Sequence, residues 1–497
     1  MKKMKKYILM GIAITSLLSS CDLDLYPYNV IESSQSFKTV SDAKNWANRL
    51  HSDLRGRVYG HYILSPDIQA DQLNATSDYG NNYGSVHRWT DLTSDNYQIR
   101  DNWQGYYSAL INVNTAIEGF ATISPANANE EKELKEYVGM AHLVRAYYYF
   151  LLNARYANAY NESTASSDLS VPLVLTPDIN ALPARNTVKE VYEQILSDLD
   201  VARTNLATKA GAANASTLNI DVVTALEARV KLYMKDWAGA KTAAETLINS
   251  NKYVLYNTAA DVKKMWHEDA PNEVIFAPFV SINELPNTQG GTYLGWNNGS
   301  RHYVPYYLPS QWVIDMFDDN DFRKDAYFLT SDSVLLSGSY HTLTMVNKYP
   351  GNPRLRAANA ATNYAHSPKI FRIAETILIA AEASYHANNP DAARNHLNKL
   401  REARGLPALA NTVTGNSLLN EIKNERFREL AFEGYRFDDL KRWGEGFTRR
   451  DPQNVNVIQR GNDFDTKTVS ANHSKFTWGI PDRDVTANPN IVQNKDW

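Results

Sequence analysis

The sequence predicts a mostly α-helical protein, built on tetratricopeptide-like helix pairs with long loops and a few short strands. Apolar residues recur at helical spacing over much of the chain, as in residues 130–157. Two segments, which start at Thr224 and Ile377, align without a gap and so indicate a repeated unit. Stretches rich in Gly, Asn and Tyr separate the helical regions and predict loops.

The N-terminus, MKKMKKYILMGIAITSLLSSCDLDLYPYN, predicts a lipoprotein signal peptide over residues 1–20. Four lysines precede a short apolar stretch, which is well below the ~20 residues that span a bilayer. Leu18-Ser19-Ser20-Cys21 is similar to a bacterial lipobox, and Cys21 is the only cysteine, so no internal disulfide can form. We expect cleavage before Cys21 and acylation there, with palmitate among the chains, because two or more chains anchor stably. The alternative is a signal peptide with a chance cysteine.

The helices expected after a polar tether at residues 22–36 follow from apolar periodicity. They cover residues 41–55, 101–121, 130–157, 188–206, 221–235, 238–250, 418–433 and 437–443. In each aligned segment, a small residue of the first helix is followed twelve positions later by a small residue of the second helix. The two pairs are Ala228 with Ala240 and Ala381 with Ala393. This spacing is typical of tetratricopeptide pairs, in which alanines let antiparallel helices approach closely; ordinary helical hairpins are the alternative.

The remaining segments predict loops and short strands. Residues 255–368 form a loop-rich insert with possible strands at 274–280 and 342–348, around an irregular stretch at 286–312. Residues 74–98 and the tail at 476–497 read as loops. We expect residues 21–497 to form one domain.

Charge and hydropathy exclude several classes of protein. The chain has 51 Lys and Arg against 55 Asp and Glu, and loss of residues 1–20 removes four lysines and no acids, which leaves a net charge near −8. No basic excess therefore suggests a nucleic-acid partner. No later stretch approaches the ~18 consecutive apolar residues of a transmembrane helix.

Two loops have the composition of a carbohydrate site, in which aromatic rings meet the C–H face of a sugar and polar groups meet its hydroxyls. The chain holds 30 Tyr and 10 Trp, and many of them lie beside Gly and Asn at residues 71–89 and 293–312. We expect Trp89 and Trp296 to be exposed stacking platforms, supported by the following residues: Tyr293, Asn298, Arg301 and Asp71. The alternative is that these side chains pack the loops against the helices.

Two other clusters are interpreted as structural. Three consecutive tyrosines, Tyr147 to Tyr149, fan around a helix, so they cannot share one binding face. An ion network of buried or half-buried groups is expected to hold the C-terminal helices, with Trp443 packed nearby. Its members are Glu425, Arg426, Arg428, Glu429 and Arg436.

Four segments together resemble the SusD/RagB family of Bacteroidetes outer-membrane lipoproteins. They are the lipobox followed by CDLDLYP, residues 145–200 (RAYYYFLLNARYANAYN…VYEQILSDLD), residues 368–407 (PKIFRIAETILIAAEASYHAN…LREARGLP), and LLNEIKNERFRELAFEGYRFDDLKRWG with the closing WGIPDRDVTANPNIVQNKDW. The polar insert at residues 161–170 departs from the family pattern. The resemblance implies a scaffold of tetratricopeptide-like helix pairs with long ligand-binding loops. It also implies an oligosaccharide ligand at the cell surface and a partner transporter of the SusC type, which is TonB-dependent and lies in the outer membrane.

The alternatives are an oligopeptide-binding protein of the RagB type, a helical-repeat scaffold without a small ligand, and a hydrolase. No nucleophile elbow, metalloprotease motif or phosphate-binding loop occurs, so no enzyme activity is expected. The 11 histidines are scattered, with no pair at i, i+4, so neither a metal site nor a cofactor is predicted.

Overall fold

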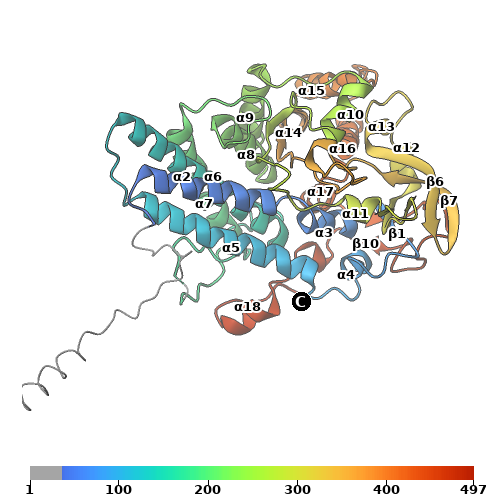
Figure 1. Ribbon diagram of the computed structural model, residues 1–497, viewed down its shortest axis with the longest axis horizontal. Coiled ribbons are helices and arrows are strands. Elements are labelled where there is room, and N and C mark those ends of the chain that lie inside the picture. The colour runs from blue at the N-terminus through green and yellow to red at the C-terminus, as the bar shows by residue number, and fades with distance from the viewer. Residues whose placement is uncertain (1–35, 179) are drawn as a thin grey trace, which may run out of the picture.

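The computed structural model describes residues 36–178 and 180–497. The signal peptide at residues 1–20 and the lipidation of Cys21 lie outside the described residues and remain predictions. Four long helices pack side by side in the N-terminal half (Figure 1). They are α2 (Val40–Gly56), α5 (Tyr97–Phe120), α6 (Ala128–Tyr156) and α7 (Val188–Leu206).

The ends of these helices follow from local sequence. Thr39 and Thr187 each form a capping box, in which the threonine side chain accepts from the backbone N–H of Asp42 or Glu190, and that acid accepts in return. Asn127 caps α6 by accepting from the N–H groups of Asn129 and Glu130. The predicted boundaries of these helices are confirmed to within four residues.

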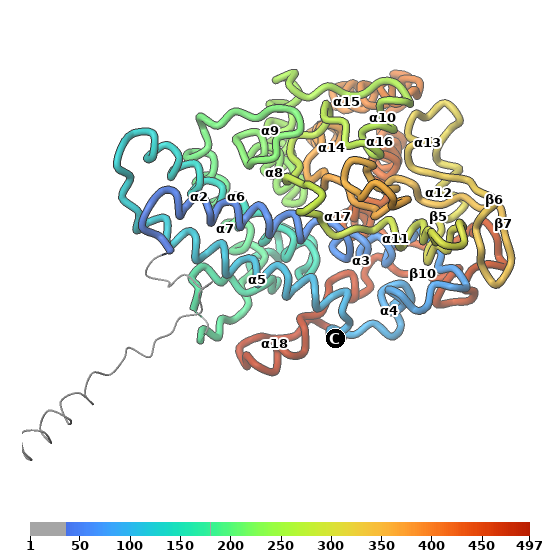
Figure 2. The backbone as a smooth tube through the Cα atoms, in the orientation of Figure 1, coloured from blue at the N-terminus to red at the C-terminus, as the bar shows by residue number. Residues whose placement is uncertain are grey.

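The two aligned segments form the predicted helix pairs, α8 (Ile220–Tyr233) with α9 (Trp237–Asn249), and α14 (Ile373–His386) with α15 (Pro390–Ala403). The small residues identified in each segment are all fully buried, as close helix approach requires. Helix α14 also packs on α9, so the pairs stack although they are far apart in the chain (Figure 2). Two further helices, α16 (Gly415–Leu430) and α17 (Arg436–Trp443), follow this stack.

The strands are short and cluster around the insert. A four-stranded sheet has the order β3-β4-β6-β7, in which β4 runs parallel to β6 and the other neighbours are antiparallel. Its strands are β3 (Trp296–Asn297), β4 (His302–Tyr303), β6 (Phe328–Leu336) and β7 (Ser339–Val346). Three two-stranded pairs complete the set: β1 (Leu73–Ala75) with β5 (Tyr307–Pro309), β2 (Val274–Phe276) with β8 (Phe371–Arg372), and β9 (Phe447–Thr448) with β10 (Thr468–Val469).

Several loop predictions need correction. The segment expected as a loop at 74–98 contains the end of β1, the helix α4 (Gly84–Arg88) and the start of α5. The stretch at 286–312 holds α11 (Gly290–Tyr293), β3, β4, β5 and the start of α12 (Gln311–Asp315), and the tail contains α18 (Asp482–Ala487). The strand expected at 274–280 ends at Phe276. These elements are too short for periodicity to reveal them.

Other short helices connect the larger elements: α3 (His61–Gln69), α10 (Ala259–His267) and α13 (Lys324–Tyr327), with single 3₁₀ turns at Pro353–Leu355 and Ser474–Phe476. A large apolar core extends from Val40 to Ile491. A smaller core, which includes Leu308, Val334 and Met345, lies under the four-stranded sheet. The two cores therefore place the sheet as a rim beside the helical body, as Figure 1 shows.

Candidate functional site

The two loops that the sequence suggested as ligand-binding regions meet in space. Strand β1 follows the first loop's opening residues and pairs with β5 in the second loop, with Ala75 opposite Tyr307. The hydroxyl of Tyr307 donates to the carbonyl of Asn82 at 2.6 Å. The hydroxyl of Thr76 donates to the carbonyl of Pro305 at 2.9 Å. Both loops therefore contribute to one side of the molecule.

Trp89 is not an exposed platform, contrary to the prediction. Only 1% of its surface is exposed. Its indole N–H donates to the carbonyl of Gln69 at 2.8 Å, and four rings surround it in edge-on or tilted contacts. Those rings belong to Phe437, Phe447, His473 and Phe476. Trp89 thus holds its loop to the core, which is the packing alternative that the sequence left open.

Tyr293 and Asp71 are also buried rather than presented to solvent. Tyr293 is fully buried, and its hydroxyl donates to the carboxylate of Asp67 at 3.4 Å. Asp71 accepts from two guanidinium nitrogens of Arg436, at 2.9 and 2.7 Å. Such a bidentate pair fixes the start of the loop to α17 and engages both carboxylate oxygens. The expectation that these two residues face a ligand from solvent is therefore wrong in this structure.

Trp296, Asn298 and Arg301 remain available, and they lie together on the β3–β4 hairpin. Trp296 is half-buried, whereas Asn298 and Arg301 are exposed. The side chain of Asn297 accepts from the N–H groups of Gly299 and Ser300, and Arg301 N–H donates to the carbonyl of Asn297 at 2.8 Å. This local turn presents the exposed side chains on a defined backbone.

Tyr303 and Tyr364 support Trp296. Trp296 lies opposite Tyr303 in the strand register, and the two ring centres are 4.8 Å apart. The backbone N–H of Trp296 donates to the hydroxyl of Tyr364 at 2.6 Å. The indole nitrogen of Trp296 is buried without a hydrogen-bond partner among the described residues.

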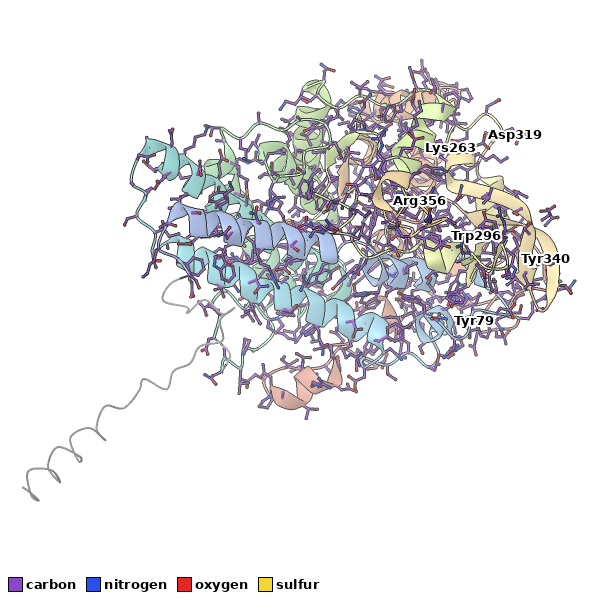
Figure 3. The ribbon with its side chains drawn as sticks, in the orientation of Figure 1. Tyr79, Lys263, Trp296, Asp319, Tyr340 and Arg356 are labelled. Atoms are coloured by element: carbon purple, nitrogen blue, oxygen red, sulfur yellow. The ribbon has the colours of Figure 1, made fainter. Side chains whose placement is uncertain are left out.

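Tyr340 is an exposed aromatic residue that sequence reasoning missed. It is 61% exposed and lies on β7, with its ring centre 6.0 Å from that of His302 on the neighbouring part of the sheet (Figure 3). Tyr340 shares one side of the sheet with His302, and Trp296 shares the other side with Tyr303. Because neighbouring residues of a strand face opposite sides, Tyr340 and Trp296 face away from each other. The Ser337-Gly338 pair was the sequence signal for this hairpin. Both residues have positive φ, as a tight hairpin turn requires.

Arg449 fastens the end of α3 to these loops. Its guanidinium is fully buried and donates to the carbonyls of Ile68, Gln69 and Ala70 at 3.0–3.1 Å, and also to that of His87. Carbonyl oxygens at a helix C-terminus carry partial negative charge and attract a cation. Burial lowers the pKa of Arg449 to about 9. The same helix end accepts from Trp89, so one junction positions the first loop.

Asp67 forms a second junction beneath the loops. Its carboxylate accepts from the side chain of Gln72 at 2.8 Å and from the backbone N–H of Gly434 at 3.1 Å, besides Tyr293. Burial raises the pKa of Asp67 to about 7, although the amide donors oppose that shift. These contacts join α3, α11 and the connection between α16 and α17.

Comparison with known proteins identifies the family. Residues 291–497 match the model of the SusD family, and residues 30–232 match a SusD-like model described as "Starch-binding associating with outer membrane". Together the two matches cover most of the chain. It belongs to the SusD-like family.

Relatives and solved structures agree with this assignment. The SusD-like proteins P38 and P2 of Formosa agariphila are 25% and 24% identical to this SusD-like chain, each over 99% of both sequences. A SusD superfamily protein of Bacteroides thetaiotaomicron has a TM-score of 0.77 at 23% identity and covers 92% of this chain and 99% of its own. A putative sugar binding protein of Bacteroides vulgatus has a TM-score of 0.76 at 23% identity, over 93% of this chain and 99% of its own. These neighbours confirm the mostly helical fold.

Neither a helix that could span a membrane nor a cluster of metal-ligating side chains occurs among the described residues. No helix in the described part of this SusD-like chain is both long and apolar enough to cross a bilayer. Within residues 36–178 and 180–497, no three His, Cys, Asp or Glu side chains are grouped as a metal site would require. The β3–β4 hairpin presents an aromatic ring, an amide and a guanidinium group, which suit stacking and hydrogen bonding with a polar ligand.

Proposed function

We propose that this protein is a cell-surface oligosaccharide-binding lipoprotein, held in the outer membrane through Cys21, that passes its ligand to a SusC-type, TonB-dependent transporter. The family description supports starch binding and association with the outer membrane. A surface glycan-binding protein A of Bacteroides fluxus, with a TM-score of 0.68, shares the fold. The lipobox supports the anchor. The proposed role is binding without catalysis.

The observation that carries the ligand proposal is the β3–β4 hairpin. Trp296 supplies an apolar ring face beside two exposed polar side chains, Asn298 and Arg301, on a turn that its own hydrogen bonds hold in place. A sugar needs this combination, because its C–H face packs on an aromatic ring while its hydroxyls need donors and acceptors. Tyr340, the other exposed ring of this sheet, faces the side opposite to Trp296 and therefore does not belong to this site.

A glycan array with the full-length lipoprotein in detergent tests this function, followed by calorimetric titration of the glycans that bind. We expect Trp296→Ala to weaken binding about tenfold or more, which is about 1.4 kcal/mol. Trp237→Ala is the matched control, because Trp237 is half-buried at the start of α9 and stacks on His386 in the helix-pair region. Equal losses in the two variants would contradict the hairpin site.

The same experiment separates the alternatives. Binding of peptides and of no glycan would favour the oligopeptide-uptake role, and defined cleavage products would reveal a hydrolase. Capture of a partner protein that is insensitive to Trp296→Ala would favour the scaffold role. The anchor is tested separately, because Cys21→Ser should release the protein from the outer-membrane fraction without changing its glycan affinity.

A further inference from the structure

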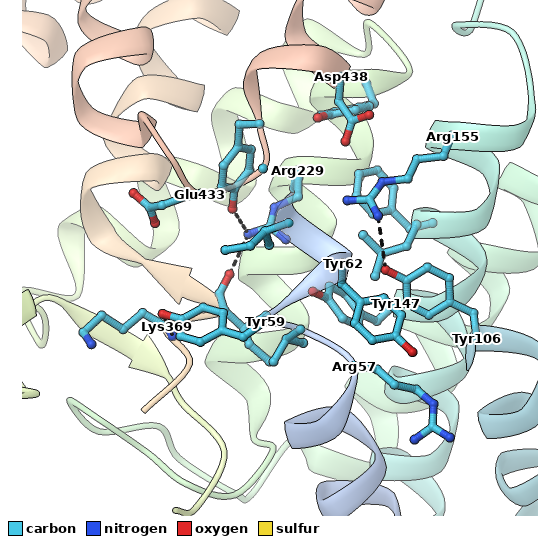
Figure 4. Close-up of a pocket in the computed structure, with 18 residues that line it drawn as sticks. Arg57, Tyr59, Tyr62, Tyr106, Tyr147, Arg155, Arg229, Lys369, Glu433 and Asp438 are labelled. Carbon is cyan, nitrogen blue, oxygen red and sulfur yellow. Dashed lines mark hydrogen bonds between the residues drawn. The ribbon is translucent and has the colours of Figure 1, made fainter. Parts of the chain in front are cut away.

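A partly open cavity of about 70 Å³ lies where the N-terminal helices meet the C-terminal segment (Figure 4). Helices α3, α5, α6, α8 and α17 all contribute to its wall. Polar residues that line it include Tyr62, Tyr106, Tyr147, Arg155, Arg229 and Asp438. The cavity differs in composition from the β3–β4 hairpin, because its polar groups are phenols and charged groups rather than amides.

Most of the charges in the wall are already paired. Arg229 binds the carboxylate of Glu375 through two nitrogens, at 2.7 and 2.6 Å. The ammonium of Lys369 lies 2.7 Å from Asp269. Glu433 is paired with both Lys348 and Arg372, at 2.8 and 2.6 Å. These groups neutralise one another through direct contacts and need nothing from the cavity.

Arg155 and Asp438 differ from the other charges. Arg155 is 3% exposed, and it donates to the side chain of Asn102 at 2.8 Å and to the hydroxyl of Tyr106 at 3.4 Å. Its Nε finds no acceptor among the described residues. Asp438 is 7% exposed, and its Oδ1 finds no donor there either. The two opposite charges line the same cavity, yet they do not approach within ion-pair distance.

A buried ion without a partner is unfavourable by several kcal/mol, so its polar atoms need hydrogen bonds. A water molecule requires ~10–15 Å³ of cavity volume together with at least two polar partners. At the ~30 Å³ that each water occupies in the liquid, the cavity of about 70 Å³ therefore has room for about two water molecules. It is much smaller than the ~300 Å³ or more of a pocket for a drug-sized organic ligand.

We propose that this cavity binds a cluster of ordered water molecules that bridges Arg155 Nε to Asp438 Oδ1. Water fits because it both donates and accepts, and because the remaining wall charges are balanced. Arg155 belongs to α6 and Asp438 to α17, so the water cluster joins the N-terminal helices to the C-terminal segment. Burial raises the pKa of Asp438 to about 6, with the charge of Arg155 opposing that shift.

A high-resolution crystal structure of the unmodified protein tests the proposal directly. We expect ordered waters within ~2.7–3.2 Å of Arg155 Nε and of Asp438 Oδ1, connected to one another. A direct contact between the two side chains, an ion, an organic molecule or featureless density would each overturn the proposal. A bromide soak with anomalous diffraction distinguishes an anion from water, because only an anion would be replaced.

A double-mutant cycle tests whether the cluster couples the two residues. Asp438→Leu should raise the unfolding equilibrium constant of the wild type by a certain factor. In an Arg155→Met background we expect this factor to be about ten times smaller, because the bridge is already broken. Asp200→Asn on α7 is the control, because Asp200 is exposed and its effect should not depend on Arg155. Independent effects of Arg155→Met and Asp438→Leu would contradict the bridge. If a variant does not fold, the crystal structure of the wild type still decides.

Discussion

At the scale of single residues, Trp89 and Trp296 show why composition alone does not identify a binding residue. Both follow Gly- and Asn-rich sequence, and both were expected to be exposed. Trp89 instead meets the carbonyl of Gln69 and a cluster of rings from the C-terminal segment, whereas Trp296 lies on a sheet at the rim. The difference arises from partners that are hundreds of residues distant in the chain.

Replacing these tryptophans should separate stability from binding. We expect Trp89→Ala to lower the free energy of unfolding by about 3–5 kcal/mol, because it leaves a large cavity in the core and removes one of the two donors to the carbonyl of Gln69. Trp296→Ala should cost far less, because its ring is only partly buried. Urea unfolding of both variants measures the difference, and equal losses would contradict the assignment of Trp89 to the core.

Asp67 should make stability depend on pH. Its pKa in the folded state, about 7, lies above its ordinary value, so the folded state binds the extra proton. The contribution of Asp67 is therefore fully present below about pH 4 and is lost as the pH rises through about 7, by up to about 4 kcal/mol. Asp67→Asn cannot ionise and should lack this slope. Denaturant unfolding from pH 4 to 8 measures it, and parallel curves for the two proteins would refute the assignment.

At the scale of elements, apolar periodicity predicted the long helices because each buries a continuous stripe over several turns. The strand expected at 342–348 coincides with most of β7, but β6 and the first residues of β7, which include Tyr340, were missed. The turn at Ser337-Gly338 is short, and its partner strands alternate only weakly in burial. The candidate site was predicted in part. Trp296, Asn298 and Arg301 lie on one hairpin, whereas Asp71 pairs with Arg436, a partner that local sequence does not reveal.

Gly295 should control the geometry of the β3–β4 hairpin. It has φ of +57°, and a Cβ added there would overlap the carbonyl oxygen of Val304. Gly295→Ala is therefore expected to displace the hairpin and to reduce glycan affinity by about tenfold, because Trp296 is the next residue. Gly338→Ala is the matched control, since Gly338 has φ of +74° but open space around it.

Calorimetric titration with the same glycan, together with the free energy of unfolding, measures both effects. The two variants share the cost of an alanine at positive φ, which is about 1 kcal/mol. Only Gly295→Ala adds a backbone overlap. An affinity loss of the same size in Gly338→Ala would show that the strain, rather than the position of Trp296, is responsible.

At the scale of the whole molecule, the ion network that was predicted to hold the C-terminal helices extends beyond them to the insert. Glu429 of α16 is fully buried and contacts Arg372 of β8 at 2.7 Å, Arg404 at 2.9 Å and Arg323 at 3.1 Å. Arg404 in turn binds Glu273 beside β2 at 2.7 Å. The network thus spans segments from 273 to 429, and the pairing of Arg436 with Asp71 extends its role to the first loop.

Glu429→Gln should therefore destabilise the entire fold. It leaves three buried guanidinium groups short of one negative charge, and loss of one partner from a buried ion network costs about 3–5 kcal/mol. The charges of Arg404 and Arg372 hold the pKa of Glu429 well below its usual range despite burial, so the wild type should lose this stabilisation only as the pH falls below about 4.5.

Glu421→Gln is the control on the same helix, because Glu421 is 35% exposed and lies 3.7 Å from Arg401. Guanidinium unfolding at pH 7 should give a small change for Glu421→Gln and a large one for Glu429→Gln, with a single transition if the network joins the molecule into one cooperative unit. A second transition in Glu429→Gln, or a loss below about 1 kcal/mol, would contradict that role.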